Sequence, residues 1–193
     1  MSGNTSISAA TKFVVAQSAQ AIVGTVSLAL GFMLFNDYIA PPPDISGRWK
    51  FTINYDDTEL TRFKGMQSTY QALIVQEGLS LSGLGEGLSS VGPSVPRENY
   101  KPKDRVNIEL SGYVKNNFFS PDEFILQYKE RGAVRESATL HNVVLSSDGS
   151  GCGCFQSTIA ATRGLVQWRR MTTTDRASDP IERSAACQAR PCQ

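Results

Sequence analysis

Few residues in this chain could carry out acid–base or nucleophilic chemistry. The only histidine is His141, which lies in a stretch of alternating residues, Thr139-Leu140-His141-Asn142. A Ser-His-Asp mechanism would need this histidine, yet the sequence contains no Gly-x-Ser-x-Gly nucleophile elbow. A lone histidine in a strand is typical of a surface position or of a satisfied core position. The sequence therefore predicts that the protein is not an enzyme and has no catalytic residues.

Glycines and cysteines form the other spacings that suggest a binding site. Gly83, Gly85 and Gly87 are spaced like a phosphate-binding loop, but no Lys-Ser/Thr pair and no helix pattern follows them. The four cysteines are Cys152, Cys154, Cys187 and Cys192. They could be free thiols, disulfides or two zinc-ligand pairs, although neither pair has the Cys-x2-Cys spacing of a zinc knuckle. We expect no metal and no cofactor.

A ligand site is better supported by tyrosines on the inner side of predicted strands. The candidate ligand-binding residues are Tyr55, Tyr70, Tyr128, Arg135 and Gln156. Each tyrosine shares a side with core residues, and its hydroxyl needs a hydrogen-bond partner when buried. Arg135 could hold an anion through two hydrogen bonds. In the alternative interpretation the tyrosines only fill the core, and Arg135 pairs with Glu130 or Glu136.

The elements that position these side chains are predicted to be strands. Apolar and polar residues alternate repeatedly along residues 46–172, with turn signals between the alternating segments. Trp49, Phe51, Ile53 and Tyr55 share one face, for example, and the glycines at 83–87 suit a sharply bent strand. We expect an all-β domain of about eight strands, with a long loop over residues 89–103. Short links favour an antiparallel up-and-down barrel that closes on itself. A two-layer sandwich is the alternative.

An uncharged run of 23 residues, Phe13 to Phe35, precedes this domain. A helix rising about 1.5 Å per residue would cover the roughly 30 Å core of a bilayer over this length. The sequence predicts a single transmembrane helix over 13–35, with the lipid bilayer as its partner, and a location in the bacterial inner membrane. A cleaved secretion signal is the alternative. The flanking charges leave the side of the membrane that carries the barrel undetermined.

The remaining segments and the charge balance complete the predicted organisation. Residues 1–12 are expected to be a flexible tail, 36–45 a Pro-rich linker, and 173–193 a flexible tail that contains two cysteines. The chain has 19 basic and 18 acidic residues, for a net charge of +1. Recognition of duplex nucleic acid needs a clustered basic face, so we expect no such partner.

Two short motifs lie at the ends of the predicted barrel. Gly47-Arg48-Trp49 opens its first strand, and Trp168-Arg169-Arg170 ends its last strand. This arrangement resembles the calycin superfamily of lipocalin, fatty-acid-binding and avidin-like barrels, in which an arginine on the last strand lies over the first-strand tryptophan. The resemblance implies a lipocalin-like barrel in which Gly47, Trp49 and Arg169 or Arg170 are structural. A guanidinium stacked on an indole would also gain cation–π energy.

The order of parts is similar to bacterial anti-phage (CBASS) membrane effectors, which join membrane helices to a small β-barrel that senses a cyclic dinucleotide. This resemblance implies a membrane effector of anti-phage defence whose barrel senses a nucleotide second messenger, and it transfers no site residue. More generally, we expect a membrane-anchored barrel that binds a small anionic or apolar ligand. The alternative function is that of a non-enzymatic accessory subunit, whose barrel is a docking surface in a larger membrane complex. Self-association and binding to membrane proteins are the interactions expected of these two functions.

Overall fold

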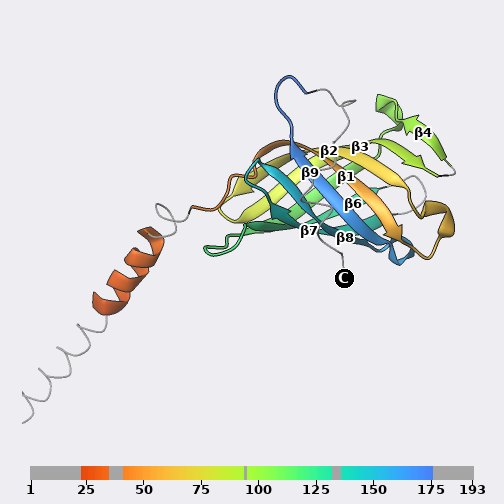
Figure 1. Ribbon diagram of the computed structural model, residues 1–193. Helices are drawn as coiled ribbons and strands as arrows, with labels where there is room; N and C mark the ends of the chain where they lie inside the picture. The colour runs from red at the N-terminus through yellow and green to blue at the C-terminus, as the bar shows by residue number, and fades with distance from the viewer. Residues whose placement is uncertain (1–22, 35–40, 94, 132–135, 176–193) are drawn as a thin grey trace, which may run out of the picture. The chain divides into compact units, whose positions relative to one another are not determined.

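The computed structural model describes residues 23–34, 41–93, 95–131 and 136–175 (Figure 1). The chain divides after Pro41, and every strand lies in the C-terminal unit. Within the predicted membrane span the structure describes a helix over residues 23–34. No helix in the described part of the chain has both the length and the apolarity needed to cross a bilayer. The predicted N-terminal tail and most of the C-terminal tail lie outside the described residues.

The C-terminal unit is built from antiparallel strands that follow one another along the chain. The strands are β1 (Gly47–Asp57), β2 (Gln67–Glu77), β3 (Ser80–Gly92), β4 (Val95–Asn99), β5 (Asn107–Lys115), β6 (Glu123–Arg131), β7 (Glu136–Leu145), β8 (Ser150–Ser157) and β9 (Arg163–Arg170). The 3-10 helices between them are η2 (Thr61–Phe63), η3 (Pro102–Asp104) and η4 (Ile159–Ala161).

Eight of these strands close into a barrel. Each pairs with the next along the chain, with β3 pairing directly with β5, and β9 returns to pair with β1. Closure satisfies the backbone groups that an open sheet would expose at its edges. The predicted closed antiparallel barrel of eight strands is therefore confirmed, the two-layer sandwich is excluded, and the barrel is compatible with a calycin-like fold.

The remaining strand, β4, corrects the prediction of an irregular loop over residues 89–103. Ser89 pairs with Asn99 and Ser90 pairs with Glu98, which extends β3 and β4 into a hairpin (Figure 1). The side chains of residues 96–99 are all exposed, and their sequence has no apolar alternation, so periodicity could not predict β4. We call this β3–β4 hairpin the β4 flap. Tyr100, which follows β4, donates a hydrogen bond to Ser90 Oγ over 2.8 Å.

Glycines allow β3 to approach its neighbour closely inside the barrel. A Cβ atom on Gly83 would lie 2.5 Å from the carbonyl oxygen of Leu73, and one on Gly85 would overlap the carbonyl oxygen of Gln71. Because both contacts are with backbone atoms of β2, a side chain could be accommodated only by moving that strand. This explains why the glycine run belongs to a strongly curved strand.

Aromatic side chains fill the half of the barrel nearest the start of β1. The inward-facing cluster contains Trp49, Phe51, Phe124, Trp168 and His141, and each of these side chains is buried. Phe51 stacks on Trp168 with ring centroids 4.2 Å apart, and Phe124 meets the same indole edge-on at 5.4 Å. This half of the interior is a packed core, so any internal ligand site has to lie at the other end.

Candidate functional site

A cavity of about 180 Å³ occupies the end of the barrel where β1, β6 and β8 finish. Its lining combines aromatic rings with hydroxyls and one carboxyl. The lining residues are Ile53, Tyr55, Phe63, Met66, Ser68, Tyr70, Tyr100, Tyr128, Glu130, Ser137, Thr139, Phe155, Ser157 and Ile159. All three tyrosines singled out from the sequence are in this set, so the structure brings them together.

The strands position the tyrosines through simple alternation. Tyr55 ends the inward row of β1, Tyr70 lies near the start of β2, and Tyr128 follows Leu126 on the inner face of β6. The rings of Tyr70 and Tyr128 are 5.6 Å apart, and Tyr70 also stacks on Phe51 at 5.0 Å. The tyrosines therefore contribute both to the aromatic core and to the cavity wall, which combines the two interpretations offered by the sequence.

Glu130 is the residue of this site that sequence reasoning missed. It is the next inward position of β6 after Tyr128, and Glu130 Oε2 accepts a hydrogen bond from the Tyr70 hydroxyl over 3.1 Å. Burial raises the pKa of Glu130, and the bond from Tyr70 opposes that rise. The sequence suggested Glu130 only as a possible ion-pair partner of Arg135, although extending the alternation of Phe124, Leu126 and Tyr128 by one step places Glu130 on the inner face.

Hydroxyl groups supply the rest of the polar surface. Thr139 donates to Ser157 Oγ over 3.0 Å, across the β7–β8 pair. Burial raises the pKa of Tyr55 to about 12, although a hydrogen bond with Ser68 opposes this effect. Burial also raises the pKa of Tyr70 and of Tyr128. At neutral pH the tyrosines are therefore uncharged groups that can both donate and accept hydrogen bonds.

The two other candidate ligand residues are not part of this cavity. Arg135 lies outside the described residues. Gln156 is exposed on the outer face of β8, where it lines a groove of about 720 Å³ together with Glu59 and Leu140. Its outward direction follows from alternation, because the neighbouring Phe155 points into the core. Glu136, one of the acidic residues considered as a partner of Arg135, lies 2.9 Å from Arg131.

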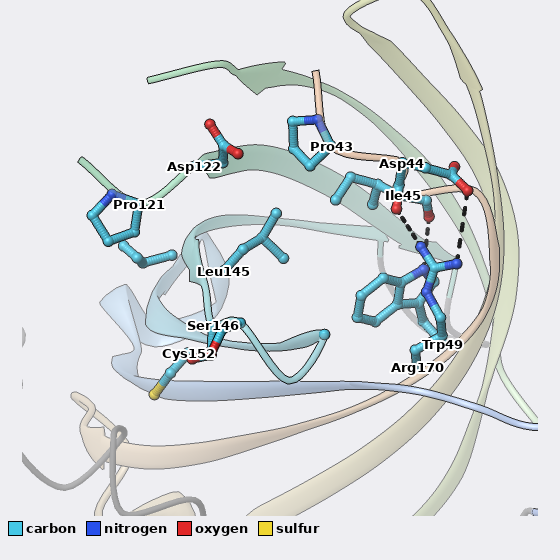
Figure 2. A pocket seen from close by; sticks show the side chains of 13 residues that line it. Pro43, Asp44, Ile45, Trp49, Pro121, Asp122, Leu145, Ser146, Cys152 and Arg170 are labelled. Atoms are coloured by element: carbon cyan, nitrogen blue, oxygen red, sulfur yellow. Dashed lines mark hydrogen bonds and ion pairs between the residues drawn. The ribbon is translucent and has the colours of Figure 1, made fainter. Parts of the chain in front are cut away.

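The opposite end of the barrel is closed by the two sequence motifs (Figure 2). Arg170 pairs in register with Trp49, and its guanidinium carbon lies 5.2 Å from the centroid of the indole. The same guanidinium donates to the carbonyl oxygen of Asp44, and the indole N–H donates to the carbonyl oxygen of Ile45 over 2.7 Å. Arg170 is thus the arginine over the tryptophan, whereas Arg169 lies 3.9 Å from Asp175.

A groove of about 840 Å³ lies outside this closed end, between the chain entering β1, the β5–β6 loop and the β7–β8 turn (Figure 2). Its described charged residues are Asp44, Asp122 and Arg170, and Arg170 already lies 3.8 Å from the Asp44 carboxylate. The groove is larger than the cavity, but its charges do not favour an anion.

His141 lies in the core rather than in the cavity. Its Nδ1 atom accepts a hydrogen bond from the Trp168 indole over 3.2 Å, and its ring lies 5.3 Å from Phe51 and 5.2 Å from Tyr128. Burial lowers the pKa of His141 to about 3. The imidazole is therefore neutral at physiological pH and acts as a packed acceptor for the indole.

The described residues contain no group of three or more histidine, cysteine or acidic side chains placed to hold a metal ion. Cys152 and Cys154 are both disulfide-bonded, so these two are neither free thiols nor zinc ligands. No protein-family model, curated protein or solved structure shows significant similarity to this chain.

Proposed function

We propose that this protein is a membrane-anchored binding protein whose barrel takes a small ligand into the cavity bounded by Tyr70, Tyr128 and Glu130. In this proposal residues 13–35 are the membrane anchor, as their uncharged sequence predicts. The observation that carries the proposal is the polar cavity at one end of an otherwise packed barrel. A barrel that served only as a rigid support would gain stability by filling this end with apolar side chains as well.

The chemistry of the wall favours a ligand that donates hydrogen bonds. Glu130 is the only acidic or basic side chain among the described residues that line the cavity, apart from the tyrosine hydroxyls. A ligand ammonium or amide N–H could bind the Glu130 carboxylate in place of the Tyr70 hydroxyl, and a cation there would return the pKa of Glu130 toward its ordinary value. An anion would meet a carboxylate in a poorly hydrated site. We therefore propose small amines or amides as the ligand class.

The cavity also limits the ligand by size. Its volume of about 180 Å³ corresponds to about six water molecules at roughly 30 Å³ each. It is smaller than the roughly 300–1,000 Å³ of most sites for drug-sized ligands. A cyclic dinucleotide, as the anti-phage version of the proposal requires, is several times larger than this space. That version would need the groove beside Trp49 and Arg170 instead.

Thermal melting of the full-length protein in detergent tests the proposal with three panels: small amines and amides, small carboxylates, and cyclic nucleotides. A ligand at 100 times its Kd stabilises the native state by about 2.7 kcal/mol, which raises Tm by roughly 5–10 °C in a chain of this size. We expect shifts of this order with the best amine or amide. In Glu130→Gln the shift should fall at least severalfold, because the variant cannot present a carboxylate.

Glu98→Gln is the matched control, because Glu98 lies on the exposed β4 flap and not in the cavity. It should keep the full ligand-induced shift. The absence of a shift with every member of the three panels would contradict the proposal. A shift with cyclic nucleotides that is unaffected by Glu130→Gln would move the site to the other end of the barrel.

A second candidate function, docking to another membrane protein or to a second copy, is favoured by an apolar patch on the outer face of β2 and β3. Leu73 and Leu84 pair directly across these strands, Val75 lies next to them on the same face, and all three are exposed. Surface patches of this kind commonly mark protein interfaces.

Substituting both leucines tests the docking function. If it is correct, Leu73→Ser with Leu84→Ser should abolish fixed-stoichiometry assembly of the detergent-solubilised protein, measured by analytical ultracentrifugation. The control Leu140→Ser, at an exposed leucine of β7, should leave assembly unchanged. A wild-type protein that sediments as a monomer free of partners would exclude this function.

A further inference from the structure

One region on the outside of the barrel is buried although its side chains point away from the core. Thr52, Gln167 and Cys152 form a single row across β1, β9 and β8, and Lys50 lies in the adjacent row opposite Arg169. Lys50 is only 2% exposed and Cys152 only 5% exposed, and Thr52 and Gln167 are buried as well. Polar residues on the outer face of a barrel are normally solvated, so this outer patch of Lys50, Thr52, Cys152 and Gln167 is a covered surface.

The two cysteines of β8 indicate what holds the cover in place. Cys152 and Cys154 point to the same outer face and are both disulfide-bonded. Residues two apart in a strand are separated by about 6.6 Å with parallel Cβ directions, whereas a disulfide needs Cβ atoms roughly 3.5–4.5 Å apart. The two cysteines therefore do not bond to each other. The only other cysteines in the sequence are Cys187 and Cys192.

The described part of the chain also ends on this surface. After β9 the backbone turns at Thr172, whose N–H donates to Asp175 Oδ2 over 2.7 Å, and Asp175 Oδ1 lies 3.9 Å from Arg169 Nη2. That N–H, and to a lesser extent the charges of Arg169 and Lys50, lower the pKa of Asp175. From Asp175 the next cysteine is twelve residues away. An extended chain of that length reaches about 40 Å, which is ample to return to β8.

We propose that the C-terminal segment is the occupant of the outer patch and is fixed there by two disulfides that join Cys152 and Cys154 to Cys187 and Cys192. Each bond forms when two thiols give up two protons and two electrons to an external disulfide, such as that of a thiol–disulfide oxidoreductase, which is reduced to two thiols. Disulfides of this structural kind persist in oxidising compartments. The barrel therefore lies on the non-cytoplasmic side of the membrane. This assignment rests on the membrane anchor proposed above and adds to it the side that carries the barrel.

Peptide mapping without reduction tests the pairing directly. The full-length protein is extracted in the presence of an alkylating agent and digested with trypsin. We expect peptide 136–163, which contains Cys152 and Cys154, joined to peptide 184–193 with the loss of four hydrogens. A 136–163 peptide that has lost two hydrogens alone, alkylated cysteines, or a disulfide-linked dimer on a non-reducing gel would each overturn the proposal.

A second measurement tests the cover independently of the bonds. In Cys187→Ser with Cys192→Ser, Lys50 should react with an amine-specific reagent at least tenfold faster than in the wild type, because the segment is no longer held over it. Lys129, which is exposed on β6, is the internal control and should react equally in both proteins. Circular dichroism verifies that the barrel remains folded. Unchanged protection of Lys50 in the folded variant would show that another element covers the outer patch.

Discussion

Replacing Trp168 with alanine is expected to lower the free energy of unfolding by about 3–5 kcal/mol, the usual cost of truncating a buried tryptophan. Trp168 is 1% exposed, stacks on Phe51 and meets Trp49 edge-on with centroids 6.2 Å apart. Its indole N–H is also the donor to His141 Nδ1. The substitution therefore opens a cavity and removes a buried hydrogen bond. Urea unfolding of the full-length protein, followed by far-UV circular dichroism, measures the loss.

Two further variants separate packing from hydrogen bonding at Trp168. Trp168→Phe keeps an aromatic ring against Phe51 but leaves His141 Nδ1 without its donor, and an unsatisfied buried group costs about 1–3 kcal/mol. Trp168→Phe should therefore lower the free energy of unfolding, but by less than Trp168→Ala does. Phe119→Ala is the control, because Phe119 is 97% exposed and its truncation should change stability by no more than about 0.5 kcal/mol. Equal losses for Trp168→Ala and Phe119→Ala would refute the packing argument.

The barrel could be predicted from the sequence because its strands alternate regularly. The rows beginning at Trp49 and at Phe124 each place buried residues at every second position, and the short turns leave little choice of strand neighbours. β4 could not be predicted in this way, because residues 96–99 are exposed on both faces and show no apolar period. The predicted membrane span is not confirmed, since the described helix covers only residues 23–34 of it.

The candidate site could be predicted only in part, because its residues lie near the ends of strands, where side-chain type and strand alternation suggest different directions. Tyr70 and Tyr128 were found because they continue apolar rows, whereas Glu130 continues such a row with a charged side chain. Charged residues near turns are normally solvated, so composition outweighed alternation there. The same alternation turns Gln156 to the outer face of β8, because its neighbour Phe155 takes the inward position. At both positions the pleat of the strand sets the direction of the side chain, whatever its chemical type.

Acidification is expected to destabilise the protein through His141. Burial holds the pKa of this group at about 3 in the folded state, whereas in the unfolded chain it is about 6.5. Between these values the unfolded state binds a proton that the folded state cannot, so stability is fully present above pH 6.5 and falls as the pH decreases toward 3. The slope rises toward 1.4 kcal/mol per pH unit as the pH falls, which gives a loss of about 2 kcal/mol between pH 6.5 and 4.5.

The contribution of Glu130 to stability depends on pH in the opposite sense, so it has to be measured separately from the contribution of His141. Its raised pKa means that the folded state holds a proton more tightly, so its contribution is present below the ordinary glutamate pKa and is lost as the pH rises through the folded value. His141→Asn keeps an acceptor for Trp168 but does not titrate in this range. The stability difference between wild type and this variant should therefore shrink by about 2 kcal/mol from pH 6.5 to 4.5. In Glu130→Gln the fall of stability with decreasing pH should be steeper than in wild type. Parallel curves for wild type and His141→Asn would mean that the imidazole is protonated in the folded core.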